Sequence, residues 1–335
     1  PHTAGTPPFQ IDPQWIGRVE QVIDWGLEEG LYLVINAHHE DWLKEDFSPV
    51  NAARFDSIWS QVAERFKDKS PKLFFEILNE PIGLTTEQVD RINSQILYTI
   101  RRTNPTRIVL YSGRDYSGLQ YMKEAAVPDD EYIMAYFHSY DPWKFAGEGE
   151  GTWGTDGDIN SIKAMFEEAA LWSSQKNIPV MINEFGAVHD CDYNSRMRHY
   201  FTYVENAVKY SIGFQVLDDG GWFGIYDRKN RTWPEVKDIL IYTYPDSPTD
   251  LNITVDGNPK SALLSWHNRT EETIKIIVER KTNDGEFEIL TEIAKEKTKY
   301  MDNSIAGNTT YTYRIIAKND NGTDRYSYPY KISVK

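Results

Sequence analysis

The sequence predicts an α/β fold, a (β/α)8 TIM barrel, followed by a small all-β sandwich domain. Two observations support this. Short, nearly continuous apolar runs alternate with amphipathic segments over residues 31–220, and short alternating strands follow after residue 250. Continuous apolar runs are typical of parallel strands that helices cover on both faces. A barrel of this type carries its functional groups at the carboxyl ends of its strands.

Six apolar runs predict the barrel strands. They are LYLVINAHH (31–39), KLFFEILNE (72–80), RIVLYSG (107–113), EYIMAYFHSY (131–140), PVMINEFG (179–186) and GFQVLDDG (213–220). Since the barrel has eight strands, we expect its first two strands to be absent from a truncated chain, which begins at Pro1 without a methionine. No glycine-rich phosphate loop follows the first run, which argues against a dinucleotide-binding fold.

Amphipathic segments between the runs predict helices. The first has Asp12 as its N-cap and Pro13 at its first helical position, and Gly30 can end it. Its apolar residues keep helical spacing; they are Trp15, Ile16, Val19, Val22, Ile23 and Leu27. Two further apolar stripes are Ile159, Ile162, Phe166 and Ala169, and Met197, Tyr200, Phe201, Val204 and Val208.

We expect the barrel over residues 1–243, a linker over 244–249 and the sandwich over 250–335. The sandwich strands are predicted at LNITVD, ALLSWHN, IKIIVERK, FEILTEI, TYTYRIIAKN and YPYKISV. This segment resembles a fibronectin type III or immunoglobulin-like module, with Trp266 in a core position and Tyr311 at the place of a tyrosine corner.

The short, proline-containing linker favours packing of the module on the barrel. Alternating tyrosines on its last strand are more often core or interface than a carbohydrate-binding face; they are Tyr326, Tyr328 and Tyr330.

The composition excludes several classes of partner. The 335 residues include 36 Lys plus Arg against 51 Asp plus Glu, a net charge of −15. A surface this negative repels phosphate backbones and anionic lipids, so we expect neither nucleic acid nor membrane partners. The single cysteine, Cys191, excludes an internal disulfide and a cysteine-based zinc site. We see no apolar run of membrane-spanning length and no signal peptide.

Polar side chains end the predicted strands, and in a barrel such ends converge on one face. They are His38, His39, Glu40 and Asp41; Asn79 and Glu80; His138, Ser139 and Tyr140; Asn183 and Glu184; Asp218 and Asp219. Paired carboxylates suit cleavage of a glycosidic bond, because one protonates the leaving oxygen while the other attacks the anomeric carbon. Four tryptophans follow strand ends, where indole faces can stack on sugar rings; they are Trp42, Trp143, Trp153 and Trp222.

Each feature also has a plainer interpretation. An Asn-Glu pair at a strand end is often a helix cap or a surface carboxylate. His38 and His39 can be a core histidine with a solvated neighbour, or "HHED" can bind a divalent metal. Each tryptophan alone is more often a packing residue than a sugar platform. The combination of acid, amide, imidazole and phenol at several strand ends favours an active site.

Five blocks resemble glycoside hydrolase family 5, the cellulase family, in the family's order over about residues 10–240. They are VINAHHEDW, FEILNEP, AYFHSYDPW, PVMINEFGA and DDGGWFGIYDR. The resemblance implies a retaining mechanism on β-linked glucans without metal or organic cofactor, with Glu80 as general acid/base and Glu184 as nucleophile. It also implies that Asn79 binds the hydroxyl next to the anomeric carbon. We expect the substrate to contact His38, His39, Asn79, His138, Tyr140, Trp143, Leu217 and Trp222.

Two departures from the family pattern stand out. An arginine that supports the nucleophile, carried by the family's first two strands, has no counterpart here. The family usually has a tryptophan floor under the sugar where this chain has Leu217, which gives up aromatic stacking worth up to about 1 kcal/mol. We expect Trp222 to substitute for it in part.

We therefore expect a secreted endo-β-1,4-glucanase, a cellulase, because a polymeric glucan does not enter cells readily. A mannanase, a xyloglucanase or a mixed-linkage glucanase would use the same machinery. A non-catalytic glycan-binding protein and a metal hydrolase built on His38 and His39 are the alternatives from other classes.

Overall fold

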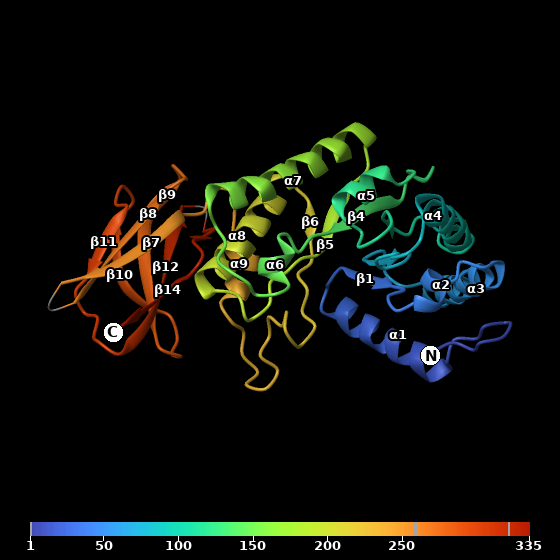
Figure 1. Cartoon of the computed structure of the whole chain (residues 1–335), viewed down its shortest axis with the longest axis horizontal. Helices are drawn as coiled ribbons and strands as arrows, with labels where there is room; N and C mark the ends of the chain where they lie inside the picture. The colour runs from blue at the N-terminus through green and yellow to red at the C-terminus, as the bar shows by residue number, and fades with distance from the viewer. Residues whose placement is uncertain (1, 258–259, 321) are drawn as a thin grey trace. The chain divides into compact units, whose positions relative to one another are not determined.

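The computed structural model describes residues 2–257, 260–320 and 322–335 (Figure 1). The chain forms two compact units. The first unit consists of Pro1–Ser139 and Ala169–Asn183, and the second of Tyr140–Glu168 and Glu184–Lys335. The predicted linker at 244–249 lies inside the second unit, and the predicted domain boundary stays a prediction.

The first unit contains a parallel sheet whose strands follow in chain order. They are β1 (Leu33–Asn36), β2 (Leu73–Glu76), β3 (Val109–Tyr111), β4 (Ile133–His138) and β5 (Val180–Glu184), of which the last residue already belongs to the second unit. Leu33 pairs with Leu73 and Phe75 with Val109. Phe75, Leu110 and Tyr136 are buried, as expected for strands covered on both faces.

The observed strands are shorter than the apolar runs that predict them. After β2 the backbone still bonds to its neighbours, because the N–H of Ile77 donates to the carbonyl of Leu110 at 3.1 Å, and Ile77 and Leu78 stay buried. Apolar character therefore continues beyond the strand, and Asn79 and Glu80 lie in a loop. The sixth predicted strand, in the second unit, shortens in the same way to β6 (Gly213–Phe214).

The helices of the first unit are α1 (Pro13–Glu28), α2 (Asp41–Glu45), α3 (Pro49–Phe66), α4 (Thr86–Arg101) and α5 (Leu119–Glu124). The predicted N-cap is confirmed, because Asp12 Oδ1 accepts hydrogen bonds from the backbone of Gln14 at 2.7 Å and Trp15 at 3.0 Å. On the predicted apolar face of α1, Ile23 is buried, whereas Trp15 and Val22 are exposed. Helix α1 leads into β1, the edge strand of the sheet, and among the described residues no further strand lies beyond β1 for the helix to cover.

The second unit contains α6 (Trp143–Ala146), α8 (Tyr193–Lys209) and α9 (Val236–Tyr242), while α7 (Asp156–Lys176) begins in it and ends in the first unit. The predicted apolar stripes at 159–169 and 197–208 lie on α7 and α8. Within the described residues, no helix combines the length and apolarity needed to cross a membrane.

The C-terminal part of the second unit is all β, as predicted. Its strands are β7 (Thr249–Asp256), β8 (Ser261–His267), β9 (Thr273–Thr282), β10 (Glu288–Ala294), β11 (Lys299–Asp302), β12 (Thr309–Asn319), β13 (Arg325–Tyr326) and β14 (Tyr330–Val334). One sheet has the order β11-β8-β7, and the other has the order β10-β9-β12-β13 with β14 also paired to β12. Trp266 is buried, and Tyr311 Oη accepts a hydrogen bond of 2.9 Å from the backbone of Ala306. The short strands β11 and β13 were not predicted.

Candidate active site

The loop after β2 holds Glu80 in an unusual backbone conformation. The backbone N–H of Asn79 donates to the carbonyl of Ala37 at 2.9 Å, so the ends of β1 and β2 stay together. Glu80 has φ 38°, in the left-handed region that residues other than glycine rarely adopt, and the backbone of Ile82 donates to its carbonyl at 2.7 Å. Strained positions of this kind cluster at functional sites. The loop thus fixes the carboxylate immediately beyond the carboxyl end of the strand.

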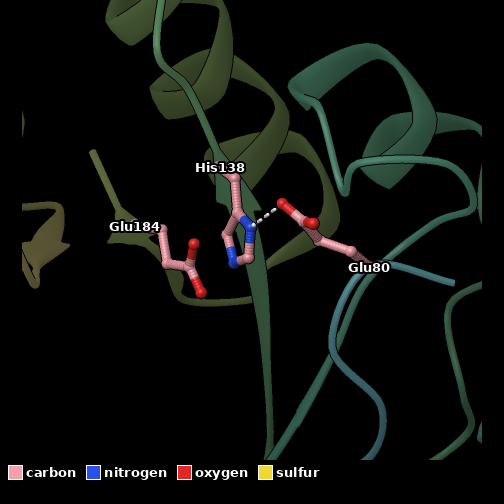
Figure 2. Close-up of side chains that lie close together, drawn as sticks. All are labelled: Glu80, His138 and Glu184. Atoms are coloured by element: carbon pink, nitrogen blue, oxygen red, sulfur yellow. Dashed lines mark hydrogen bonds and ion pairs between the residues drawn. The ribbon is translucent and has the colours of Figure 1, made fainter. Parts of the chain in front are cut away.

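Glu80 has an imidazole as its partner. Nδ1 of His138, the last residue of β4, lies 3.0 Å from Oε1 of Glu80 in a hydrogen bond (Figure 2). The histidine is buried, whereas the glutamate side chain keeps 21% of its surface exposed. A partly accessible carboxyl group that an imidazole holds in place is suited by its position to general acid/base chemistry.

A second carboxylate, Glu76, lies buried beneath this loop and was missed in the sequence analysis. Its Oε1 accepts a hydrogen bond of 3.0 Å from Asn36 Nδ2, and its Oε2 accepts one of 2.6 Å from Asn183 Nδ2. Glu76 is only 2% exposed. Two strands separate β2 from β5 in the sheet order, so this bond spans the concave side of a strongly curved sheet. In the sequence, the one sign of this role was an acidic residue inside an apolar strand. Burying a carboxylate there costs free energy unless it has hydrogen-bond partners.

The structure brings His38 close to Asn79. His38 Nε2 lies 3.5 Å from Asn79 Nδ2, and His38 Nδ1 lies 3.4 Å from Asn36 Nδ2. The ring of His39 packs edge-on against that of His38, with centroids 4.6 Å apart. Both histidines line a cavity of about 470 Å³, together with Trp15. Among the residues that the structure describes, neither histidine belongs to a group of three His, Cys, Asp or Glu at metal-ligand spacing.

Lys44 on α2 is a further polar residue near Glu80 that was not predicted. Its Nζ donates to the backbone carbonyl of His38 at 3.3 Å. Burial lowers the pKa of Lys44, and the attraction of Asp41, Glu80 and Glu40 opposes that shift. Burial also raises the pKa of Glu40, the acid of the "HHED" run. Helix α2 therefore places a cation within electrostatic reach of Glu80.

In the second unit, Tyr140 holds Glu184. The tyrosine Oη donates a hydrogen bond of 2.9 Å to Oε2 of Glu184, the residue that ends β5 and is labelled in Figure 2. The ring of Tyr140 packs edge-on against Trp143 and Phe223, with centroids 6.1 Å and 5.2 Å away. Gly186, two residues after Glu184 in the sequence, lies against the same ring: a Cβ atom on it would be 3.2 Å from Phe223 Cδ1. Only glycine fits at this position without displacing the aromatic ring that supports Tyr140.

The loop after β6 carries Leu217 and Trp222. The backbone of Leu217 donates to the carbonyl of Phe185 at 2.9 Å, so this half-buried side chain lies beside the residue that follows Glu184. Trp222 is 76% exposed. Asp218, a predicted strand-end residue, forms an ion pair of 2.8 Å with Arg228.

For two of the four tryptophans that could stack on sugars, other side chains of the protein already cover the ring. Trp153 is 5% exposed and packs against Phe145 and His199, so of its two interpretations the packing residue is confirmed and the sugar platform is wrong. Its apolar ring is more stable in the core than in a loop. The guanidinium of Arg54 lies 4.1 Å from the ring centroid of Trp42 and covers that indole face. Trp143 and Trp222 keep exposed rings.

The chain is similar to known endoglucanases. The sequence model described as "Cellulase (glycosyl hydrolase family 5)" matches residues 1–218. Endoglucanase H of Acetivibrio thermocellus is 42% identical over 254 residues, which are 73% of this chain and 28% of that protein. Endoglucanase A of Ruminococcus albus is 34% identical over 278 residues, 72% of this chain and 75% of that protein.

The solved structures agree with this similarity. A hyperthermophilic endo-β-1,4-glucanase in complex with substrate has a TM-score of 0.69 at 31% identity, covering 72% of this chain and 81% of that one. The predicted barrel fold class is thereby confirmed. The chain spans about a quarter of Endoglucanase H and three quarters of Endoglucanase A. From the match over residues 1–218 and these identities, the chain belongs to glycosyl hydrolase family 5, the cellulase family.

Proposed function

We propose that the chain is a retaining endo-β-1,4-glucanase in which Glu80 is the general acid/base and Glu184 the nucleophile. The observation that carries this assignment is the different partner of each carboxylate. Tyr140 donates to one oxygen of Glu184, which orients the carboxylate for attack as a nucleophile. His138 beside Glu80 suits a group that must gain and lose a proton in each cycle.

The reaction has two displacements. Glu184 attacks the anomeric carbon while Glu80 protonates the leaving oxygen, which gives a covalent glycosyl-enzyme. Glu80 then takes a proton from water, and the water oxygen displaces Glu184 with net retention. This chemistry requires the two carboxyl groups to be about 5 Å apart.

A β-1,4-glucan is the substrate that the similarity to endoglucanases favours. A neutral polymer is compatible with the net charge of −15. We assign His38, His39 and Asn79 to hydroxyl contacts, and the exposed rings of Trp143 and Trp222 to stacking on sugars. Leu217 would provide an apolar but non-aromatic wall.

The test compares Glu80→Gln and Glu184→Gln with Glu64→Gln, an exposed carboxylate on α3. Hydrolysis of carboxymethylcellulose should fall at least about 1,000-fold in the first two variants and stay normal in the third. NMR of the first product anomer should show retention. Normal activity of either active-site variant would refute the assignment. Glycan binding by the native chain without any product would favour a binding protein instead.

The C-terminal strands, we further propose, form an immunoglobulin-like module that packs on the catalytic domain. The Tyr311 hydrogen bond to Ala306 has the form of a tyrosine corner. Lys281 pairs with Glu235 at 2.8 Å and Arg314 pairs with Asp238, both at α9. Tyr326 stacks on Tyr242 of α9 with ring centroids 4.6 Å apart, and Tyr328 packs edge-on against Phe201 of α8 at 5.3 Å, which leaves less of the tyrosine stripe for a polysaccharide. A pull-down of the whole chain and of a Tyr330→Ala variant on insoluble cellulose would show whether this face binds.

A secreted location is also a proposal, since a polymeric substrate lies outside cells. Fractionation of the producing culture, with immunodetection of the protein, tests it. Recovery in the cell lysate alone would contradict secretion.

A further inference from the structure

Helix α8 has two opposite faces, one toward the segments that carry Tyr140 and Glu184 and the other toward the C-terminal strands. Most of its residues are buried. At 3.6 residues per turn, one face presents Arg196, His199, Tyr200 and Tyr203, and the opposite face presents Asn194, Arg198, Phe201 and Glu205. Polar side chains on both faces are unusual for a buried helix and must be satisfied by specific partners.

The first face holds the segment that follows Glu184. Arg196 Nε donates to the carbonyl of Ala187 at 2.9 Å, and Tyr200 Oη accepts from the backbone N–H of Ala187 at 3.0 Å. Phe185, next to Glu184, stacks parallel on Tyr203 with ring centroids 5.2 Å apart. Three positions on α8 therefore determine where the backbone runs after the proposed nucleophile.

The same face holds the segment that carries Tyr140. His199 Nε2 donates to the carbonyl of Asp141 at 2.9 Å, and Tyr203 Oη donates to the same oxygen at 3.3 Å. Asp141 directly follows Tyr140, whose phenol donates to Glu184. Helix α8 thus fixes the backbone beside both partners of the Tyr140–Glu184 hydrogen bond.

The opposite face is held by the C-terminal strands. Asn194 makes two bonds with the backbone of Lys331, donating to its carbonyl at 3.0 Å and accepting from its N–H at 2.7 Å. Arg198 donates to Tyr328 Oη from Nε at 3.1 Å and from Nη2 at 2.7 Å. Glu205 forms an ion pair with Arg269. These bonds fix both the rotation and the axial position of α8.

We propose that the C-terminal strands act through α8 as a positioning element for Tyr140 and Glu184. This inference rests on the proposed function, because it assumes that Glu184 is the nucleophile. Displacements well below 1 Å at a reacting carboxylate are enough to slow a reaction. Asn194, Arg198 and Tyr328 are then positioning residues, and loosening them lowers turnover without weakening substrate binding.

The experiment uses Tyr328→Phe and Asn194→Ala in the full chain. Tyr313→Phe is the matched control, because its hydroxyl is also buried in the C-terminal strands but donates to Asp302 at 2.8 Å. We expect kcat to fall about 5-fold in the first two variants with KM changed less than about 2-fold. The control should keep kcat at temperatures well below its unfolding midpoint.

A double-mutant cycle with Tyr140→Phe separates positioning from general stabilisation. If the strands act through the Tyr140–Glu184 bond, Asn194→Ala should cost much less kcat in the Tyr140→Phe background than in the native one. Independent effects in the cycle, unchanged kcat in both interface variants, or an equal loss in Tyr313→Phe would each overturn the proposal. Full activity of Glu184→Gln would instead refute the proposed function, so the two failures are distinguishable.

Discussion

Asn183 donates a hydrogen bond of 2.6 Å to the buried carboxylate of Glu76, across two intervening strands of the parallel sheet. Asn183 precedes Glu184, and Glu76 ends the strand that leads to Glu80. Asn36 occupies the other oxygen of Glu76 at 3.0 Å. One buried carboxylate therefore joins three strands at the end of the sheet that carries the proposed catalytic groups.

Glu76→Gln is expected to weaken this junction. The amide nitrogen of glutamine cannot accept a hydrogen bond, so one of the two asparagine donors loses its acceptor. The free energy of unfolding in urea should fall by about 1–3 kcal/mol, and kcat should fall about 10-fold through misplacement of the neighbouring residues. Glu64→Gln on the surface of α3 is the control and should change neither. Native stability and turnover in Glu76→Gln would show that the junction is dispensable.

Trp222→Ala should raise the KM for a soluble polysaccharide about 5-fold, because an indole face contributes about 1 kcal/mol of stacking. Trp222 is 76% exposed, so its removal should not change the unfolding midpoint. Trp25→Ala on α1 removes another exposed indole and should leave KM unchanged. An unaltered KM in Trp222→Ala would mean that this ring does not compensate for Leu217.

Local sequence patterns predicted the strands, the N-cap at Asp12 and the strand-end location of Glu80. These features depend on residues adjacent in sequence, whose periodicity and polarity can be read directly. The importance of Glu76 could not be read in this way, since its partner Asn183 lies 107 residues away and meets it only through the curvature of the sheet. Which of the four tryptophans is a packing residue could not be read locally either, since Trp153 is buried against His199 of α8, which is distant in the sequence.

Cys191 should resist alkylation in the folded protein. It is the single cysteine of the chain, it is buried, and its Sγ donates to the carbonyl of Phe145 at 3.0 Å. Burial raises the pKa of the thiol to about 11, so little reactive thiolate exists at pH 8. Iodoacetamide at pH 8, followed by mass spectrometry, should modify the urea-unfolded chain at least about 10-fold faster than the folded one. Equal rates would show that the thiol is accessible.

His199 should make the stability of the fold depend on pH. Burial lowers the pKa of this fully enclosed imidazole from 6.5 to about 4, against the opposing effect of its bond to the Asp141 carbonyl. Between these values the unfolded chain binds a proton at this residue and the folded chain does not. The free energy of unfolding should therefore decrease as the pH falls from about 6.5 to 4, by about 3 kcal/mol from this group alone.

Urea unfolding of the native chain and of His199→Gln at pH 7.5 and 4.5 measures this contribution. His199→Gln should be less stable at pH 7.5, because it loses ring packing against Tyr203, but should lose less stability on acidification. His267→Gln removes an exposed histidine and should keep the native pH dependence. Parallel losses in all three chains would assign the acid sensitivity to carboxylates and exclude His199 as its source.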